Sequence, residues 1–335
     1  MENEKNVKIK RPPVKFEETQ KIIIDVENKL QSKLICYWNS NNGEICGNDV
    51  YVFNDIIKNL SLKDELYIFI KSKGGSGTQS LRIVNLLRNY VKKIYALVPV
   101  ECCSAATMMA LGANEIFMGP IAYLSAVDTS IDHDLSPVDK NNSQVNVSQD
   151  ELIRVIKLWN KQSGKAKTNP YQSLYSHIHP LVFGAVDRAS SLSIKLCKEI
   201  LSYHIDDEKK INRISSSLNS NYPSHNYPIT YKEAKKIGIN VKQMDPYVNE
   251  KLILLNNIYS EMGQRALTDY DEQNYHDNEI LNITEGRGVQ IYYQPDKDWH
   301  YRKEERRWVP MNDNSSWHKN LMVNGKSSKS VFHIR

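Results

Sequence analysis

The first part of the chain alternates short apolar runs with stretches of helical periodicity. Four apolar runs have the length and composition of strands, at residues 33–39, 65–71, 92–100 and 115–119. Between them, apolar residues recur every three or four positions, the spacing of one helix face, at residues 50–60, 78–91 and 104–113. This order predicts an α/β fold in which helices pack on a largely parallel sheet.

The pattern changes twice further along the chain. Residues 150–262 are mostly of helical periodicity, and one of these helices should begin after Thr230 and stop at Gly238. After Gln264 the chain becomes polar, then strand-like with many aromatic and charged residues. We therefore expect a flexible N-terminal arm (1–20), one domain (21–264) and a small C-terminal appendage of unknown role (265–335).

Composition narrows the class of protein. The chain has 335 residues, 40% hydrophobic and 25% charged, with a net charge of +5. This charge is too small to indicate a nucleic-acid partner, and no apolar run reaches membrane-spanning length. Five cysteines without a CxxC pair give no zinc motif, so we expect no metal and no cofactor. The charged N-terminus is unlike a signal peptide, and we expect a cytoplasmic protein without a membrane partner.

Two turns at strand ends bear the residues of most chemical interest. Gly74 and Gly75 follow one strand, and Ser104 stands between the next strand and a helix. In a parallel α/β sheet, ligand sites form at these carboxyl ends. A serine at a helix start can act as a nucleophile, and the N–H groups of Gly75 and Ala105 can hold an oxyanion. Each part alone has an ordinary explanation, because serines often cap helices and paired glycines often form turns.

Together these segments resemble the Clp protease/crotonase-like superfamily, and within it the serine dehydrogenase proteinase group. That group is related to the Clp proteolytic subunit and to signal peptide peptidase A. The similar segments are "LYIFIKSKGGSGTQSLRIVNLLRNY", "ALVPVECCSAATMMALGANEIFMGP", "HPLVFGAVDRA" and "YPSHNYPITYKEAKKIGINV". The resemblance covers roughly residues 30–260. It implies that residues 21–264 form a serine peptidase domain of repeated β-β-α units, with Ser104 as nucleophile and Gly74, Gly75 and Ala105 around the oxyanion.

The general base is left open by the sequence. The position of the Clp-type histidine falls on Val127, beside Asp128, and that of the Clp-type aspartate falls near Asn226, beside His225. One hypothesis is a rearranged triad of Ser104, His225 and Asp128, because the chemistry needs only an imidazole at the hydroxyl and a carboxylate behind it. The other is a Ser–Lys dyad with Lys140 as base, as in signal peptide peptidase A.

The sequence therefore predicts a serine peptidase that hydrolyses peptide bonds through an acyl-enzyme on Ser104. Three alternatives stay open: a catalytically silent oligomeric scaffold of the same fold, a crotonase-type acyl-CoA enzyme, and a specialised effector whose C-terminal appendage recognises a partner or gates the site. The resemblance implies a homo-oligomer, as a trimer, hexamer or larger ring, acting on a peptide or protein substrate. A further protein partner could bind through the C-terminal appendage.

Overall fold

The computed structural model describes residues 8–127, 130–131, 134–137, 145, 147–162 and 169–334. Its helices are α1 (Phe16–Leu30), α2 (Gly47–Asn59), α3 (Gly77–Arg88), α4 (Ala105–Leu111), α5 (Gln149–Gln162), α6 (Pro170–Leu174), α7 (Pro180–Ser202), α8 (Glu208–Ser220), α9 (Tyr231–Ile237) and α10 (Pro246–Met262). Its strands are β1 (Lys33–Asn39), β2 (Glu65–Lys71), β3 (Lys93–Val98), β4 (Glu101–Cys102), β5 (Glu115–Met118), β6 (Tyr123–Leu124), β7 (Ser130–Ile131), β8 (Val147–Ser148), β9 (Val241–Gln243), β10 (Ala266–Asp269), β11 (Asn274–Asn278), β12 (Asn282–Gly286), β13 (Val289–Gln294), β14 (Asp296–Arg302), β15 (Arg307–Asp313), β16 (Ser316–Val323) and β17 (Lys326–Val331).

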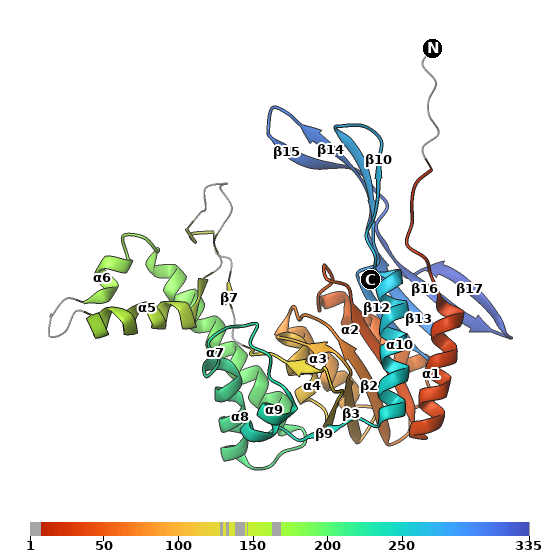
Figure 1. The fold of residues 1–335 in the computed structure, drawn as a ribbon, viewed down its shortest axis with the longest axis horizontal. Coiled ribbons are helices and arrows are strands. Elements are labelled where there is room, and N and C mark those ends of the chain that lie inside the picture. The colour runs from red at the N-terminus through yellow and green to blue at the C-terminus, as the bar shows by residue number, and fades with distance from the viewer. Residues whose placement is uncertain are drawn as a thin grey trace.

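A nine-stranded sheet with helices on both faces forms the body of the molecule (Figure 1). The strand order is β17-β16-β13-β12-β1-β2-β3-β5-β9. From β1 to β9 every neighbouring pair is parallel, and from β1 to β17 every pair is antiparallel. The predicted α/β class is confirmed, and the parallel half is built from the alternating strands and helices that the hydrophobic pattern indicated.

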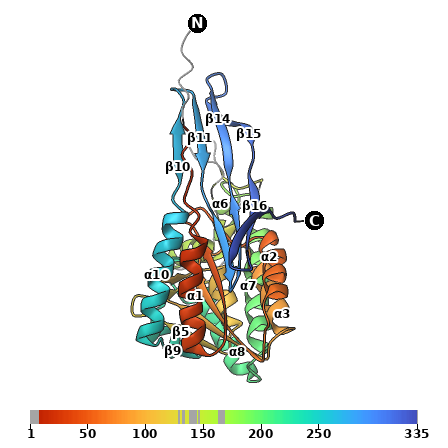
Figure 2. The ribbon, with the colours of Figure 1, turned by 90° about the vertical axis from the view of Figure 1, so that its right-hand side faces the viewer.

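Strands β1, β2, β3 and β5 of the parallel half contribute apolar side chains to both faces, because successive residues point to opposite sides. Ile35, Ile68 and Ile70 pack in a cluster with α2, α3 and α4. Trp38 and Phe69 pack in a second cluster with α1 and α10. Figure 2 shows α1 and α10 side by side on one side of the sheet and α2 and α3 on the other. A sheet buried on both faces explains why its strands read as continuous apolar runs.

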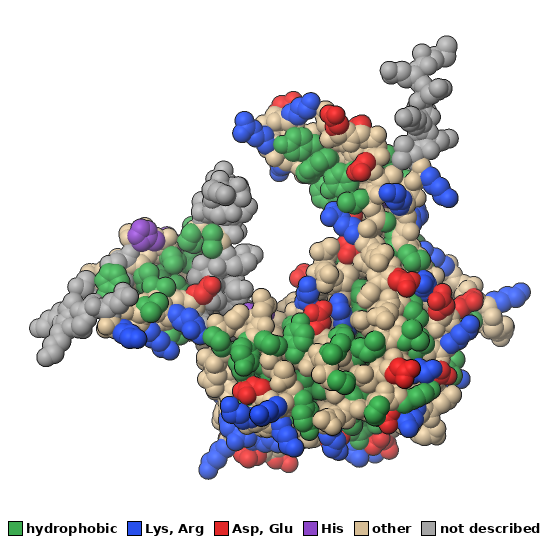
Figure 3. Space-filling view, viewed as in Figure 1, with side chains coloured by type: hydrophobic (Ala, Val, Ile, Leu, Met, Phe, Trp, Pro, Cys, Tyr) green, Lys and Arg blue, Asp and Glu red, His purple; other side chains and the backbone are tan. Residues whose placement is uncertain are grey.

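The C-terminal segment has two structural roles. Strands β12, β13, β16 and β17 extend the main sheet beyond β1, so this part of residues 265–335 is not separate from the body. Strands β10, β11, β14 and β15 form a second, four-stranded sheet that projects from the body (Figures 1 and 2). Figure 3 shows hydrophobic side chains on this projection, where Trp308 and Met311 are exposed. Helix α10 ends at Met262, and the first strand of the C-terminal segment begins at Ala266.

The N-terminal arm is shorter than the sequence suggested. Residues 16–20 already belong to α1, while residues 8–15 have no helix or strand. The Lys10 N–H donates to Thr268 Oγ1 over 2.9 Å, which places this stretch against the projecting sheet.

Candidate active site

Ser104 occupies a strained turn between β4 and α4. Its backbone has φ 52° and ψ −123°, a conformation that costs non-glycine residues on the order of 1–3 kcal/mol. It stands at the N-cap position of α4, yet its side chain makes no capping hydrogen bond. The ordinary explanation of this serine, a helix cap, is therefore wrong. A strained strand-to-helix turn that presents a serine hydroxyl is the geometry of a nucleophile elbow.

Two buried hydroxyl side chains hold this turn in place. The Ser104 N–H donates to Ser125 Oγ over 2.8 Å, and the Ser125 N–H donates to Thr107 Oγ1 over 3.2 Å. Thr107 Oγ1 donates in turn to the Cys102 carbonyl over 2.7 Å. These bonds link the residues before and after Ser104 to the loop that follows β6. Sequence reasoning missed Ser125 and Thr107, because nothing in their neighbourhood distinguishes them from other small polar residues.

Gly74 allows the nucleophile to approach the paired-glycine turn. A Cβ on Gly74 would lie 2.6 Å from Ser104 Cβ, and its φ of 117° is one that side chains disfavour. The Gly74 N–H donates to Ser72 Oγ over 3.0 Å. Because this N–H already has a partner, Gly74 serves the site by its missing side chain.

Gly75 and Ala105 present two backbone N–H groups beside Ser104. The Gly75 N–H points away from Ile45, since the Gly74 carbonyl and the Ser76 N–H make the hydrogen bonds of the Ile45–Gly75 bridge. Within the part of the chain that the structure describes, neither the Gly75 nor the Ala105 N–H has a hydrogen-bond acceptor. Two unpaired donors from separate loops are what a developing oxyanion requires.

A cavity of about 440 Å³ brings these groups together. The cavity is lined by the paired-glycine turn, the Ser104 turn, apolar side chains of α4 and α7, and one histidine. Its lining residues are Gly75, Ser76, Gly77, Thr78, Ser104, Ala105, Met108, Val127, Ala189, Leu192, Ser193, Leu196 and His225. Ser104, Gly75, Ala105 and His225, which the sequence singled out, therefore face one space. A cavity with an apolar wall and a few convergent polar groups is typical of ligand sites.

His225 reaches this cavity from the loop between α8 and α9, and its side chain is half-buried. The loop is fixed beside β6, because Leu124 and Ile229 exchange backbone hydrogen bonds of 3.0 and 2.8 Å. Val127, where the Clp-type histidine would be expected, also lines the cavity. The partners proposed from sequence, Asp128 and Lys140, lie outside the described residues.

Cys103 is the neighbouring side chain that could compete with Ser104 as nucleophile. Burial raises the pKa of its thiol to about 11, with a smaller contribution from the Glu101 carboxylate. The reactive form of a cysteine is the thiolate, which is scarce at neutral pH for such a group. Cys103 is also not among the residues lining the cavity. The position and chemistry of these two residues favour Ser104.

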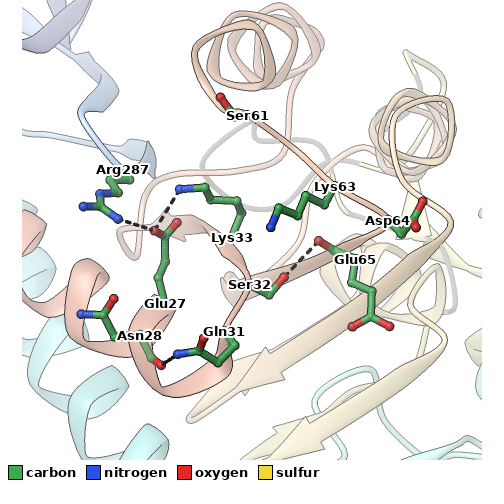
Figure 4. Close-up of a pocket in the computed structure, with 10 residues that line it drawn as sticks. All are labelled: Glu27, Asn28, Gln31, Ser32, Lys33, Ser61, Lys63, Asp64, Glu65 and Arg287. Atoms are coloured by element: carbon green, nitrogen blue, oxygen red, sulfur yellow. Dashed lines mark hydrogen bonds and ion pairs between the residues drawn. The ribbon is translucent and has the colours of Figure 1, made fainter.

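A second cavity, of about 500 Å³, lies at the opposite ends of the parallel strands (Figure 4). One of its lining residues is Glu27, a buried carboxylate 3.3 Å from Lys33 Nζ and 3.6 Å from Arg287 Nη1. The Glu27 carboxylate also accepts the Leu34 N–H over 3.1 Å. These paired charges anchor the end of α1 to β1. The amino ends of parallel strands are not where α/β sheets bind substrates.

Two further properties of the described residues bear on function. No three or more His, Cys, Asp or Glu side chains among them are grouped so as to hold a metal ion. Where the chain is described, none of its helices combines the length and apolar character needed to cross a bilayer.

The chain is distantly similar to a few known proteins. No known protein-family profile matches the chain. An uncharacterized protein of Methanocaldococcus jannaschii is 23% identical over 277 residues, covering 78% of this chain and 87% of the relative. Among solved structures, a mutant of the 1510-N membrane-bound stomatin-specific protease covers 70% of this chain and 88% of its own, with 16% identity and a TM-score of 0.39.

A second mutant of that protease, in complex with a substrate peptide, also covers 70% of this chain, with 16% identity and a TM-score of 0.38. Both structures are similar to this chain only at a level that leaves its activity to be inferred from its own site.

Proposed function

We propose that this chain is a serine-type peptidase of the Clp/crotonase-like fold, with Ser104 as its nucleophile. The observation that carries this function is the Ser104 turn: a strained serine without a capping bond, facing a cavity that it shares with two unpaired backbone donors and a histidine. A structural serine has no need of strain, whereas an exposed nucleophile does.

The chemistry follows from the groups around the cavity. His225 accepts the proton of the Ser104 hydroxyl while Oγ attacks the substrate carbonyl. The carbonyl oxygen gains a negative charge, which the N–H groups of Gly75 and Ala105 stabilise. Collapse of the tetrahedral intermediate breaks the C–N bond, and protonated His225 gives its proton to the leaving amine. Water then hydrolyses the ester on Ser104, again with His225 as base.

The partner of the base is a separate part of the proposal. Asp128 would orient the His225 imidazole, because it directly follows Val127 in the chain and Val127 lines the cavity. Lys140 is the competing base. The apolar wall made by Met108, Leu192 and Leu196 suits a substrate with an apolar side chain next to the scissile bond.

A fluorophosphonate probe tests this function directly, because it phosphonylates activated serines. We expect wild-type protein to be labelled, Ser104→Ala to lose all labelling and the neighbouring Cys103→Ala to keep it. Mass spectrometry of the labelled protein should locate the probe on the peptide that contains Ser104. Wild-type protein that resists the probe would instead indicate the silent scaffold or the acyl-CoA enzyme.

The same assay separates the two bases. His225→Ala should lower the labelling rate by a factor of about 100 or more, the scale of general-base catalysis. Lys140→Ala should label as wild type. The opposite result would assign the base to Lys140 and overturn the triad.

A further inference from the structure

A buried carboxylate near the cavity has no part in the chemistry described above. Asp49, in the first turn of α2, has no exposed surface. Its Oδ2 accepts the Cys46 N–H over 2.7 Å and the Tyr37 hydroxyl over 3.0 Å. Burial raises the pKa of this carboxyl to about 6, against the effect of its hydrogen-bond donors. A carboxylate is costly to bury without a cation, so it needs hydrogen-bond donors around it. The bond from Cys46 is part of a capping box at the start of α2, and the other donors come from outside that helix.

Asn282, the first residue of β12, completes this arrangement. Its side-chain amide donates to Asp49 Oδ1 and Oδ2 over 3.1 and 3.2 Å, and to the Glu44 carbonyl over 2.8 Å. Asp49 and Asn282 therefore hold the backbone of residues 44–46 from both ends, at Glu44 and at Cys46. We name residues 44–46 the bracing segment.

The bracing segment in turn fixes the paired-glycine turn. The Ile45 N–H donates to the Gly74 carbonyl over 2.7 Å, and the Ser76 N–H donates to the Ile45 carbonyl over 2.9 Å. A Cβ on Gly75 would lie 2.5 Å from the Ile45 nitrogen, so the two backbones are in direct contact. These bonds determine the orientation of the peptide planes on both sides of Gly75, and with it the direction of the Gly75 N–H.

We propose that Asp49 and Asn282 are positioning residues for the Gly75 oxyanion donor, acting through the bracing segment. This role rests on the function proposed above. It also assigns a part in the site to β12, which the sequence places in the C-terminal appendage. An oxyanion donor must point at the developing charge before the reaction begins, and a backbone N–H has no side-chain torsion with which to adjust. The bracing segment, which is hydrogen-bonded to the glycine turn, supplies that preorganisation.

The rate of fluorophosphonate labelling tests this role, because the phosphonyl oxygen needs the same donors as a carbonyl oxygen. Asn282→Ala removes the bonds to Glu44 and Asp49, and we expect the labelling rate to fall about tenfold or more. Tyr37→Phe is the matched control: it also removes a hydrogen bond to the Asp49 carboxylate, but none to the bracing segment. We expect it to label within about twofold of wild type.

Thermal unfolding of each variant, followed by circular dichroism, shows that labelling is measured on folded protein. If Asn282→Ala does not fold, Asp49→Asn takes its place. It keeps the shape of the side chain but replaces one of the two acceptor oxygens with an N–H donor, which then faces either the Cys46 N–H or the Asn282 amide.

Slow labelling in Asn282→Ala or Asp49→Asn, with normal labelling in Tyr37→Phe, supports the proposed positioning role. Wild-type rates in folded Asn282→Ala, or equal losses in Tyr37→Phe, overturn it while leaving Ser104 as nucleophile. Labelling that persists in Ser104→Ala overturns the peptidase and the brace together.

Discussion

The two halves of the nine-stranded sheet are buried in different ways. In the parallel half, β1 and β2 bury mainly aliphatic and aromatic side chains. In the antiparallel half, β12 and β13 are just as buried, yet many of their enclosed side chains are polar: Asn282, Thr284, Glu285, Gln290 and Gln294. One sheet thus combines a half held chiefly by apolar packing with a half held largely by hydrogen bonds. Ser104 and the paired glycines follow strands of the first half, and Asn282, one of the two residues that we propose to position Gly75, belongs to the second.

Glu285 is the centre of the polar half. Its Oε1 accepts hydrogen bonds of 2.6 Å from Thr19 and 2.7 Å from Gln20, both on α1. Its Oε2 accepts bonds of 2.8 Å from Tyr259, on α10, and 2.6 Å from Gln290, on β13. One fully buried carboxyl therefore joins two helices and two strands. Such a network specifies a unique arrangement, because any other packing leaves buried donors without acceptors.

The largest effect should follow a change at the turn of the parallel half. Gly74→Ala places a Cβ 2.6 Å from Ser104 Cβ, and we expect fluorophosphonate labelling to fall about a hundredfold or more because the nucleophile is displaced. Gly325→Ala is the matched control in the antiparallel half: its φ of 74° brings similar backbone strain, but a Cβ there meets nothing within 4 Å. Equal labelling in the two variants would show that Ser104 and the glycine turn do not act together.

The next effect should follow the truncation of a core side chain in the antiparallel half, and it concerns the free energy of unfolding. Ile291, on β13, is fully buried in the cluster that also contains Ile68 of β2. Ile291→Ala should lower the free energy of unfolding by about 2–5 kcal/mol. Val331→Ala, on the exposed β17, should change it by less than about 0.5 kcal/mol.

Both halves share this core, so they should unfold together. When Ile291→Ala is unfolded, the labelling of Ser104 and the circular-dichroism signal should therefore disappear in the same transition. Separate transitions would show that the C-terminal segment folds as an independent appendage.

A third effect, on stability alone, concerns the pH dependence of the polar half. Burial raises the pKa of Glu285 to about 7 from an ordinary value of 4.5. Between these pH values the unfolded chain loses this proton while the folded protein keeps it, so stability falls as the pH rises. The loss should amount to about 3 kcal/mol relative to Glu285→Gln, which has no proton to lose. Urea titrations of both proteins at pH 4.5 and 8 measure it, and parallel pH profiles would contradict it.

The parallel half could be predicted from the sequence, and the antiparallel half could not. Strands such as β2 (Glu65–Lys71) are apolar on both faces, so their burial is visible in the residue types. In β12 (Asn282–Gly286) the buried residues are mostly polar, and polar residues read as exposed unless their partners are known. Glu285 meets Thr19 and Gln20, which lie more than 260 residues away. No local pattern contains that information.

The candidate site, like the sheet, could be predicted only in part. Ser104, Gly75 and Ala105 could be identified because strand ends and helix starts are local features that a parallel sheet brings to one edge. His225 could be suggested only through the resemblance to a known superfamily. Ser125 and Asn282 escaped notice because each hydrogen-bonds to a backbone group far away in the chain, and such a bond has no signature in residue type. Asp49 makes a local capping bond to Cys46, but its contact with Asn282 is equally distant in the sequence.

The pairing of β1 with β12 has a consequence for the newly made protein. Strand β2 follows β1 by about 30 residues in the sequence, so this pair can form early. Strand β12, which pairs with the other edge of β1, is synthesised only about 250 residues after β1. During that interval a strand of apolar residues presents unpaired N–H and C=O groups, the kind of edge on which chains aggregate. A growing chain on the ribosome thus carries Ser104 long before it contains Asn282, which we propose to steady the Gly75 amide.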